Sequence, residues 1–155
     1  MSRLENKVAI ITGAASGIGR GMARLFSAQG ALVIAVDLAE ERLYKTTASI
    51  TEAGGNVVPV VANITNEDDL DRVVAAAVER GGVAILCNNA GVLDDLTPLG
   101  DVTPELIDKV LGVNVKGTAL LSQRVLKVML EAGSGAIVNT ASAAGSNGGR
   151  GCAIY

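Results

Sequence analysis

The sequence has no histidine and no tryptophan, and it holds only two cysteines, two tyrosines and one phenylalanine among 155 residues. Without histidine, the chain cannot carry a Ser-His-Asp triad, a Cys-His dyad or a histidine metal site. Cys87 and Cys152 form no Cys-x-x-Cys pair, so we expect no zinc knuckle, no disulfide framework and no metal site. So few aromatic side chains also leave no stacking platform for single-stranded nucleic acid.

Excess positive charge and long apolar runs are also missing. The formal net charge is −3 and no run rich in lysine or arginine occurs, so we expect no nucleic-acid partner. The longest apolar runs, such as residues 31–36, are far shorter than the roughly 20 residues that span a bilayer, so we expect no membrane partner. The first residues contain no apolar stretch typical of a secretory signal, which makes the cytoplasm the default expectation.

Short runs rich in β-branched residues alternate with longer segments of helical period. The expected strands are residues 8–11, 31–36, 57–61, 83–87 and 136–139, and the expected helices are residues 18–29, 40–53, 67–79 and 104–131. Each expected strand is apolar without alternation, which is typical of strands buried on both faces of a parallel sheet. The pattern predicts an α/β fold: one domain over residues 1–155 with a doubly wound, mostly parallel, Rossmann-like sheet of five strands.

The last expected helix, residues 104–131, is apolar on nearly every side. A helix of that kind must be covered on both sides, and the sheet can cover only one of them. We therefore expect more chain or a second copy to cover its outer side, and we interpret the domain as truncated at its C-terminal end. The complete protein is accordingly expected to be a homodimer or homotetramer.

A glycine-rich turn with the spacing Gly13-x-x-x-Gly17-x-Gly19 follows the first expected strand and leads directly into a helix. Such a turn lets the backbone approach a pyrophosphate, which binds the free N–H groups of the helix N-terminus. Tight packing between strand and helix is the alternative explanation for these glycines. The second expected strand ends at Asp37, whose carboxylate can accept both ribose hydroxyls of NAD and would repel a 2′-phosphate. A helix N-cap is the alternative role for Asp37.

Three more motifs follow in order along the chain. The tetrapeptide Asn-Asn-Ala-Gly at residues 88–91 comes after the fourth expected strand, and Asn114 lies in the helix that follows. Ser142 precedes Tyr155 by thirteen residues. Together with the glycine turn, these motifs resemble the short-chain dehydrogenase/reductase family over the chain from residue 7 onward. The resemblance implies a Rossmann-like oxidoreductase that transfers a hydride between NAD and a small-molecule alcohol or ketone substrate.

The same resemblance implies roles for individual residues. Tyr155 is expected to be the general acid/base at the substrate oxygen, Ser142 to hydrogen-bond that oxygen, and Asn114 to anchor a water for proton relay. The expected cofactor-binding residues are Gly13, Ser16, Gly17, Ile18, Gly19, Asp37, Asn63, Ile64, Asn89, Ala90 and Gly91. The alternatives are a solvated loop serine, a tyrosine without a role and an asparagine satisfied inside its helix.

Two departures from the family's pattern bear on its function, whereas a third, Ala84 in place of an acid common at the start of the fourth strand, is structural. The family lowers the pKa of its tyrosine with a lysine four residues further on, whereas this chain stops at Tyr155, after a glycine-rich segment at residues 145–151. We therefore expect the chain as given to keep a dinucleotide fold but to show little or no dehydrogenase activity. Asn63 stands where the family usually has an aspartate that contacts the adenine amine, and its amide oxygen can still accept that bond.

Two other functions stand beside the NAD-dependent oxidoreductase that we favour. A non-catalytic nucleotide-binding module would have the same glycine turn and the same acidic residue after the second strand. A nucleotide-sugar epimerase of the extended relatives would have the spacing Gly-x-x-Gly-x-x-Gly, and the spacing found here counts against it.

Overall fold

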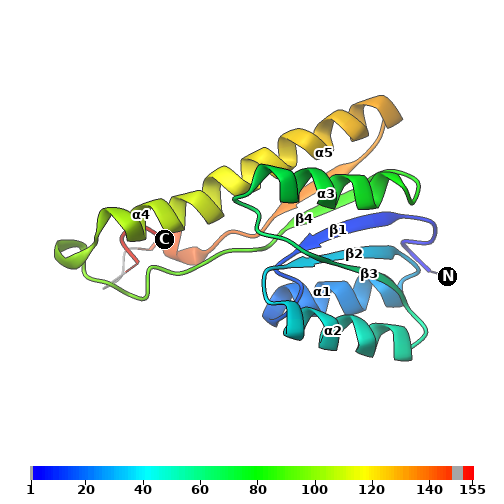
Figure 1. Cartoon of the computed structure of the whole chain (residues 1–155), viewed down its shortest axis with the longest axis horizontal. Helices are drawn as coiled ribbons and strands as arrows, with labels where there is room; N and C mark the ends of the chain where they lie inside the picture. The colour runs from blue at the N-terminus through cyan, green and yellow to red at the C-terminus, as the bar shows by residue number, and fades with distance from the viewer. Residues whose placement is uncertain (1, 148–151) are drawn as a thin grey trace.

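The computed structural model describes residues 2–147 and 152–155, so residues 148–151 of the glycine-rich segment lie outside the described residues. Within this part of the chain, five strands and five α-helices follow one another (Figure 1). The strands are β1 (Val8–Thr12), β2 (Leu32–Asp37), β3 (Asn56–Val61), β4 (Ile85–Asn88) and β5 (Ala136–Asn139). The helices are α1 (Gly17–Ala28), α2 (Glu40–Glu52), α3 (Glu67–Val78), α4 (Pro104–Leu111) and α5 (Thr118–Ala132). The strands and the first three helices begin and end within about two residues of the ranges expected from the sequence, so these predictions are confirmed.

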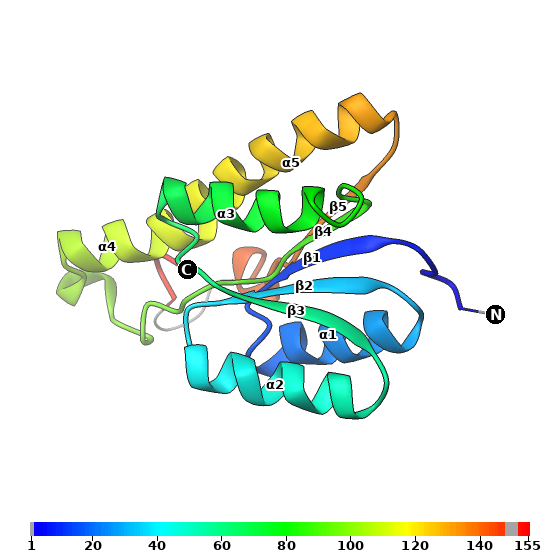
Figure 2. The same cartoon turned by 45° about the vertical axis from the view of Figure 1, so that its right-hand side comes forward.

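The five described strands are parallel and lie in the order β3-β2-β1-β4-β5. The chain starts in the middle of the sheet at β1, adds β2 and β3 on one side, and returns to add β4 and β5 on the other (Figure 2). The strand order therefore reverses between β1 and β4, and a crevice opens beyond the carboxyl ends of these strands. This arrangement confirms the predicted doubly wound α/β fold.

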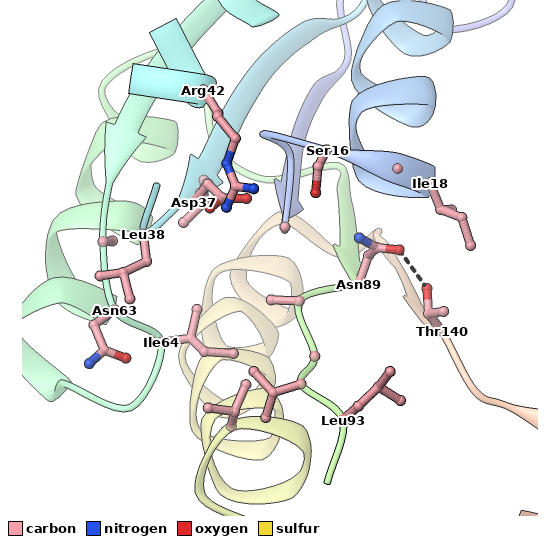
Figure 3. A pocket seen from close by; sticks show the side chains of 18 of the residues that line it. Ser16, Ile18, Asp37, Leu38, Arg42, Asn63, Ile64, Asn89, Leu93 and Thr140 are labelled. Atoms are coloured by element: carbon pink, nitrogen blue, oxygen red, sulfur yellow. Dashed lines mark hydrogen bonds between the residues drawn. The ribbon is translucent and has the colours of Figure 1, made fainter. Parts of the chain in front are cut away.

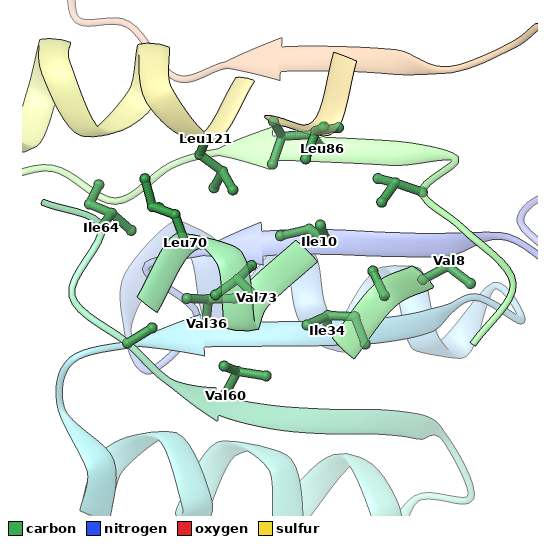
Figure 4. Close-up of a cluster of buried hydrophobic side chains, with 14 of the residues drawn as sticks. Val8, Ile10, Ile34, Val36, Val60, Ile64, Leu70, Val73, Leu86 and Leu121 are labelled. Carbon is green, nitrogen blue, oxygen red and sulfur yellow. The ribbon is translucent and has the colours of Figure 1, made fainter. Parts of the chain in front are cut away.

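Helices cover the sheet on both faces, with α1 and α2 on one face and α3 and α5 on the other (Figures 1 and 2). Successive residues of a strand point to opposite faces. Ile10 and Ile34 thus belong to the core under α3 and α5 (Figure 4), whereas Ile11 and Val33 belong to the core against α1 and α2. Because both faces are buried, the central strands are apolar except at their carboxyl ends, where Thr12, Asp37 and Asn88 stand, as the sequence pattern predicted.

The segment expected to form one continuous helix over residues 104–131 is divided in the structure. A π-helical turn (Gly112–Gly117) separates α4 from α5, so the prediction of a regular helix was wrong in its middle. One physical reason is close packing on the β3–α3 loop, because a Cβ on Gly117 would lie only 2.7 Å from the carbonyl oxygen of Ile64. Another reason is Asn114, whose side chain is hydrogen-bonded to the loop after β4. The wider π turn accommodates both contacts without ending the helix.

The two sides of α4 and α5 differ in their exposure. Leu121, Val125 and Met129 face the sheet, and at most 5% of each is exposed. On the other side lie four large apolar residues that are 46–70% exposed: Leu111, Val115, Leu126 and Leu130. The expectation that the sheet covers only one side of this segment is confirmed. None of the helices in the described part of the chain combines the length and apolar character needed to cross a membrane.

Alanine substitutions at the two ends of the π turn should have opposite effects on stability. Gly117→Ala places a Cβ against the Ile64 carbonyl oxygen, and we expect the free energy of unfolding to fall by about 1–3 kcal/mol. Gly112→Ala is the control: its Cβ would meet the Thr65 side chain at 4.0 Å, and the higher helix propensity of alanine should raise stability by up to about 1 kcal/mol. Urea titration measures both values, and equal stability of the two variants would contradict the role assigned to Gly117.

Candidate functional site

A cavity of about 600 Å³ lies beyond the carboxyl ends of the strands, where the strand order reverses (Figure 3). Its walls come mainly from the segments that follow β1, β2, β3 and β4, together with Thr140 after β5 and Tyr155. All the residues expected to bind a cofactor, with the exception of Gly19, line this one cavity. The structure therefore brings together residues that the sequence scatters over four loops.

The glycine-rich turn forms one wall of the cavity with backbone conformations that side chains disfavour. Gly13 and Gly17 have φ angles of +70° and +50°, in the left-handed region. No atom lies within 4 Å of a Cβ built on Gly17, so the chain borders open space at the first N–H groups of α1, which have no intrahelical acceptor. A Cβ on Gly19 would instead collide with the carbonyl of Gly13, so Gly19 permits close packing and does not line the cavity. The turn and the helix N-terminus together make a cradle for an anion such as a pyrophosphate.

Asp37 ends β2 and is fixed at the edge of the cavity by two backbone hydrogen bonds. Its Oδ2 accepts the N–H of Ala15 at 2.9 Å, and its Oδ1 accepts the N–H of Ala39, also at 2.9 Å. The residue is half-buried, and its oxygens keep lone pairs that can accept further hydrogen bonds. Asp37 therefore combines the two roles considered for it, because it supports the start of α2 and also presents a carboxylate to the cavity.

Arg42 and Leu38 line the same end of the cavity as Asp37, and the sequence analysis missed both. Arg42 extends from the first turn of α2 toward this end (Figure 3). The sequence could have indicated Arg42 by its position in the first turn of this helix. A helix that starts directly after a strand has its first side chains close to the carboxyl end of that strand. A carboxylate and a guanidinium, those of Asp37 and Arg42, therefore lie at the same end of the cavity. In the described residues, no group of three or more Cys, Asp or Glu side chains is placed to hold a metal ion.

The hydroxyl of Thr12 joins the cavity wall on β1 to the wall that follows β4. It accepts the N–H groups of Asn89 and Ala90, both at 3.0 Å, and donates to the carbonyl oxygen of Cys87 at 3.4 Å. The side chain of Asn89 adds two contacts: its Nδ2 donates to the carbonyl oxygen of Thr12 at 3.1 Å, and its Oδ1 accepts the hydroxyl of Thr140 at 3.3 Å (Figure 3). These bonds join the end of β1, where the glycine turn begins, to the Asn-Asn-Ala-Gly segment.

Asn63 lines the cavity, but its side-chain oxygen is already used within its own loop. That oxygen accepts both the N–H and the hydroxyl of Thr65, at 3.0 and 2.8 Å. The N–H of Asn63 donates to Oδ2 of Asp69 at 2.7 Å, and this bond, followed by the guanidinium of Arg72, holds the pKa of Asp69 below its ordinary value. Asn63 thus shapes the β3–α3 loop. The adenine contact expected from its oxygen stays a prediction.

The side chain of Asn114 is hydrogen-bonded to the loop after β4 at both of its polar atoms. Its Nδ2 donates to the carbonyl oxygen of Val92, and its Oδ1 accepts the N–H of Val92, each at 2.9 Å. A Cβ on Gly91 would lie 3.3 Å from that Oδ1, so the loop passes close to the π turn. Asn114 is therefore not satisfied inside its own helix. It lies behind the cavity wall, which Val92 and Val113 form at this point.

Tyr155 and Ser142 are placed differently in the structure. Tyr155 lines the cavity and is 41% exposed. Ser142 is exposed and begins a short 3-10 turn (Ala143–Gly145), where its Oγ accepts the N–H of Ala144 at 3.2 Å. The residue after β5 that does line the cavity is Thr140, which the sequence analysis missed although it directly follows a strand end. The structure thus brings Tyr155, but not Ser142, to the cavity that holds the expected cofactor-binding residues.

Comparison with known proteins identifies the family to which this arrangement belongs. A family model described as short chain dehydrogenase matches residues 7–155. The chain belongs to the short-chain dehydrogenases. The resemblance inferred from the glycine turn, the Asn-Asn-Ala-Gly motif and the serine–tyrosine spacing is thereby confirmed.

Curated relatives of this short-chain dehydrogenase are oxidoreductases. A 3-oxoacyl-(acyl-carrier-protein) reductase from Thermotoga maritima is 40% identical over 154 residues, which make up 99% of this chain and 62% of the relative. A galactitol 2-dehydrogenase from Agrobacterium fabrum is 40% identical over 148 residues, which make up 94% of this chain and 56% of the relative. The chain therefore spans only about three fifths of the length of the relatives that it matches.

Solved structures of the family have the same fold. A levodione reductase matches with a TM-score of 0.94 at 36% sequence identity. A 7α-hydroxysteroid dehydrogenase complexed with NADH and 7-oxo glycochenodeoxycholic acid matches with a TM-score of 0.93 at 32% identity. Each match covers 99% of this chain and 60% of the solved chain.

Proposed function

We propose that this short-chain dehydrogenase is an NAD(H)-dependent oxidoreductase that interconverts an alcohol and a ketone. The observation that carries the proposal is the cavity, in which the glycine turn, Asp37 and Tyr155 line one hollow although they lie far apart in the sequence. The names of the relatives support the reaction class, and a neighbouring structure is complexed with NADH. A non-catalytic nucleotide-binding module is the alternative that the experiments below must exclude.

The chain has a group suited to each part of a dinucleotide. Gly17 and the free N–H groups of α1 would hold the pyrophosphate, because the turn leaves room there and the helix end is electropositive. The carboxylate of Asp37 would accept the hydroxyls of the adenosine ribose. Leu38 and Ile64 offer apolar contacts beyond that ribose, and residues 89–91 border the opposite end of the cavity.

The chemistry divides between the cofactor and the chain. When bound, the nicotinamide supplies or accepts the hydride. We propose that Tyr155 manages the proton: its phenol donates a proton to the ketone oxygen during reduction, and its phenolate accepts the proton of the alcohol during oxidation. Ser142 would hydrogen-bond the same oxygen, for which the Ala143–Gly145 turn has to bring it closer to the cavity. Asn114 would help to anchor a water for proton relay, from its position behind the loop at Val92.

Removing the Tyr155 hydroxyl tests the proposed reaction. In the complete gene product, Tyr155→Phe should lower kcat by about 10²–10⁴-fold, because a positioned general acid/base contributes about that factor. NADH binding should persist, since the phenol is not needed to hold the adenosine half. Tyr44→Phe is the matched control, because Tyr44 lies on α2 and does not line the cavity.

Steady-state assays would use a sugar alcohol, a hydroxysteroid and a 3-oxoacyl thioester, the substrate classes that the names of similar proteins suggest. Unchanged turnover of the Tyr155→Phe enzyme would refute the role of Tyr155. NADH binding by the native protein, with no turnover of any substrate, would favour the nucleotide-binding module.

The charge of Asp37 should set the choice of cofactor. We expect the native protein to prefer NAD(H) to NADP(H), because the carboxylate hydrogen-bonds the ribose and repels a 2′-phosphate. Asp37→Asn keeps an oxygen that can accept one of the two backbone N–H groups but removes the charge, so NADH binding should weaken by about tenfold or more. The preference against NADPH should shrink, because Arg42 lines the same end of the cavity and could pair with the 2′-phosphate.

Titration of cofactor fluorescence measures both dissociation constants. Adding Arg42→Ala to the Asp37→Asn variant should abolish the gain in NADPH affinity and leave NADH binding unchanged, which separates the two residues. A native preference for NADP(H) would overturn the assignment of NAD.

The exposed apolar side of α4 and α5 suggests self-association. We propose that the complete protein is a homodimer or homotetramer in which Leu111, Val115, Leu126 and Leu130 are covered by a second copy. Light scattering should give a dimer or tetramer, and the double variant Leu126→Lys, Leu130→Lys should dissociate it, because two buried cations would face apolar surface. A native monomer at micromolar concentration would refute the proposal.

A further inference from the structure

Asp94 lies in the loop that follows Gly91, and none of its surface is exposed although it carries a carboxylate. No lysine or arginine forms an ion pair with it in residues 2–147 and 152–155. A buried carboxylate without a cation has to be stabilised by hydrogen bonds, so the identity of its donors indicates what it does in the fold.

Each carboxylate oxygen of Asp94 accepts a backbone N–H from a different segment of the chain. Oδ1 accepts the N–H of Leu96 at 3.2 Å, within the same loop. Oδ2 accepts the N–H of Ile154 at 3.2 Å, from a residue 60 positions later. Because Ile154 directly precedes Tyr155, the second bond holds the backbone that carries the proposed acid/base.

The loop around Asp94 is a tight turn that its own contacts keep closed. The carbonyl oxygen of Asp94 accepts the N–H of Thr97 at 3.1 Å and its hydroxyl at 2.7 Å. Asp95 and Leu96 have φ angles of +56° and +57°, in the left-handed region that side chains disfavour. Two such residues in succession persist only where neighbouring contacts hold them. The carboxylate is therefore presented to Ile154 by a turn of defined shape.

The donors around Asp94 favour its ionised form. Burial raises the pKa of Asp94, but the backbone N–H groups of Ile154, Tyr155, Leu96 and Asp94 itself together lower it by more, so this pKa lies below its ordinary value. Hydrogen bonds to an ionised acceptor are stronger than those to a neutral one. The ionised Asp94 therefore binds the backbone N–H of Ile154 more strongly than a neutral side chain would.

The same loop is fixed from its other side by Asn114. Val92, two residues before Asp94, exchanges two hydrogen bonds with the Asn114 side chain. One short loop thus connects two of the proposed functional residues, with Asn114 bonded at Val92 and the backbone before Tyr155 bonded at Asp94.

We propose that Asp94 is a positioning residue that fixes Tyr155 against the cavity by holding the backbone directly before it. This inference rests on the proposed role of Tyr155 in proton transfer. A carboxylate that only closed its own turn would need the Leu96 bond alone, whereas here the second oxygen joins a segment 60 residues away. Asp94 is fully buried and does not line the cavity, so it acts through Tyr155 and not on the substrate.

Amide hydrogen exchange of Ile154 tests the anchor directly. Asp94→Ala should reduce the protection of this amide at least about tenfold, because local opening then costs less. Asp94→Asn keeps one acceptor oxygen and the shape of the side chain, so it should lose less protection than Asp94→Ala. Asp95→Asn is the matched control, since Asp95 is exposed and asparagine tolerates its positive φ.

Exchange at Ile10 in the central strand reports whether the fold as a whole is intact. Unchanged protection of Ile154 in the Asp94→Ala protein, with Ile10 also unchanged, would overturn the proposal. If Asp94→Ala does not fold, protection of Ile154 is compared with protection of Ile10 in the Asp94→Asn protein. Unchanged protection of both amides would then overturn the proposal.

The fluorescence of Tyr155 gives an independent readout. The 155-residue chain has two tyrosines and no tryptophan, so in this chain Tyr155 is the sole such fluorophore when Tyr44 is replaced by phenylalanine. Asp94→Ala should increase its quenching by acrylamide and Asp95→Asn should not. Equal quenching in the two variants would show that Asp94 does not position the ring.

Kinetics of the complete gene product then connect the anchor to catalysis. Asp94→Ala should lower kcat by about 10²-fold, the effect of misplacing a catalytic group by about 1 Å, with the KM for NAD unchanged. A fully active Tyr155→Phe enzyme would refute the proposed function and leave the exchange result valid. If Tyr155→Phe inactivates the enzyme but Asp94→Ala leaves kcat unchanged, the positioning role of Asp94 is refuted and the proposed role of Tyr155 stands.

Discussion

The hydroxyl of Thr12 joins the carboxyl ends of β1 and β4, and the shape of the cavity depends on this junction. The strand order reverses between these two strands, so the segments after them leave in opposite directions and form facing walls. Thr12 is almost fully buried and bonds Asn89, Ala90 and Cys87 through one oxygen. A shift between β1 and β4 would move the glycine turn away from the Asn-Asn-Ala-Gly segment, and the cavity would lose the close approach of its two walls.

The loop after β4 links this junction to the more distant parts of the site. Asn89 is bonded to Thr12, Val92 to Asn114, and Asp94 to Ile154. Residues that are scattered over the sequence are therefore all hydrogen-bonded to this one loop. The π turn is part of the same arrangement, because it lets Asn114 bond the loop while Gly117 packs on the β3–α3 loop.

The fold and most of the cavity could be predicted from the sequence, because their causes are local or periodic. Apolar runs without alternation predicted strands buried on both faces, and the glycine spacing predicted an anion cradle at the start of a helix. The errors came where a side chain is used by a distant segment. The break at residues 112–117 arises from contacts with Ile64 and with the loop after β4. Arg42 and Thr140 both lie close after a strand end in the sequence, but the packing of the elements decides that their side chains line the cavity.

The sequence by itself determined the α/β class, the strand positions, the family resemblance and the anion cradle, because hydrophobic period and glycine spacing act over a few residues. Only the tertiary structure decided which residues meet. It brought Asp37, Asn89 and Tyr155 to one cavity, left Ser142 outside it, and paired the carboxylate of Asp94 with the N–H of Ile154. The physical reason is that such contacts join residues tens of positions apart, and the strand order and helix packing that set their distances are properties of the whole chain.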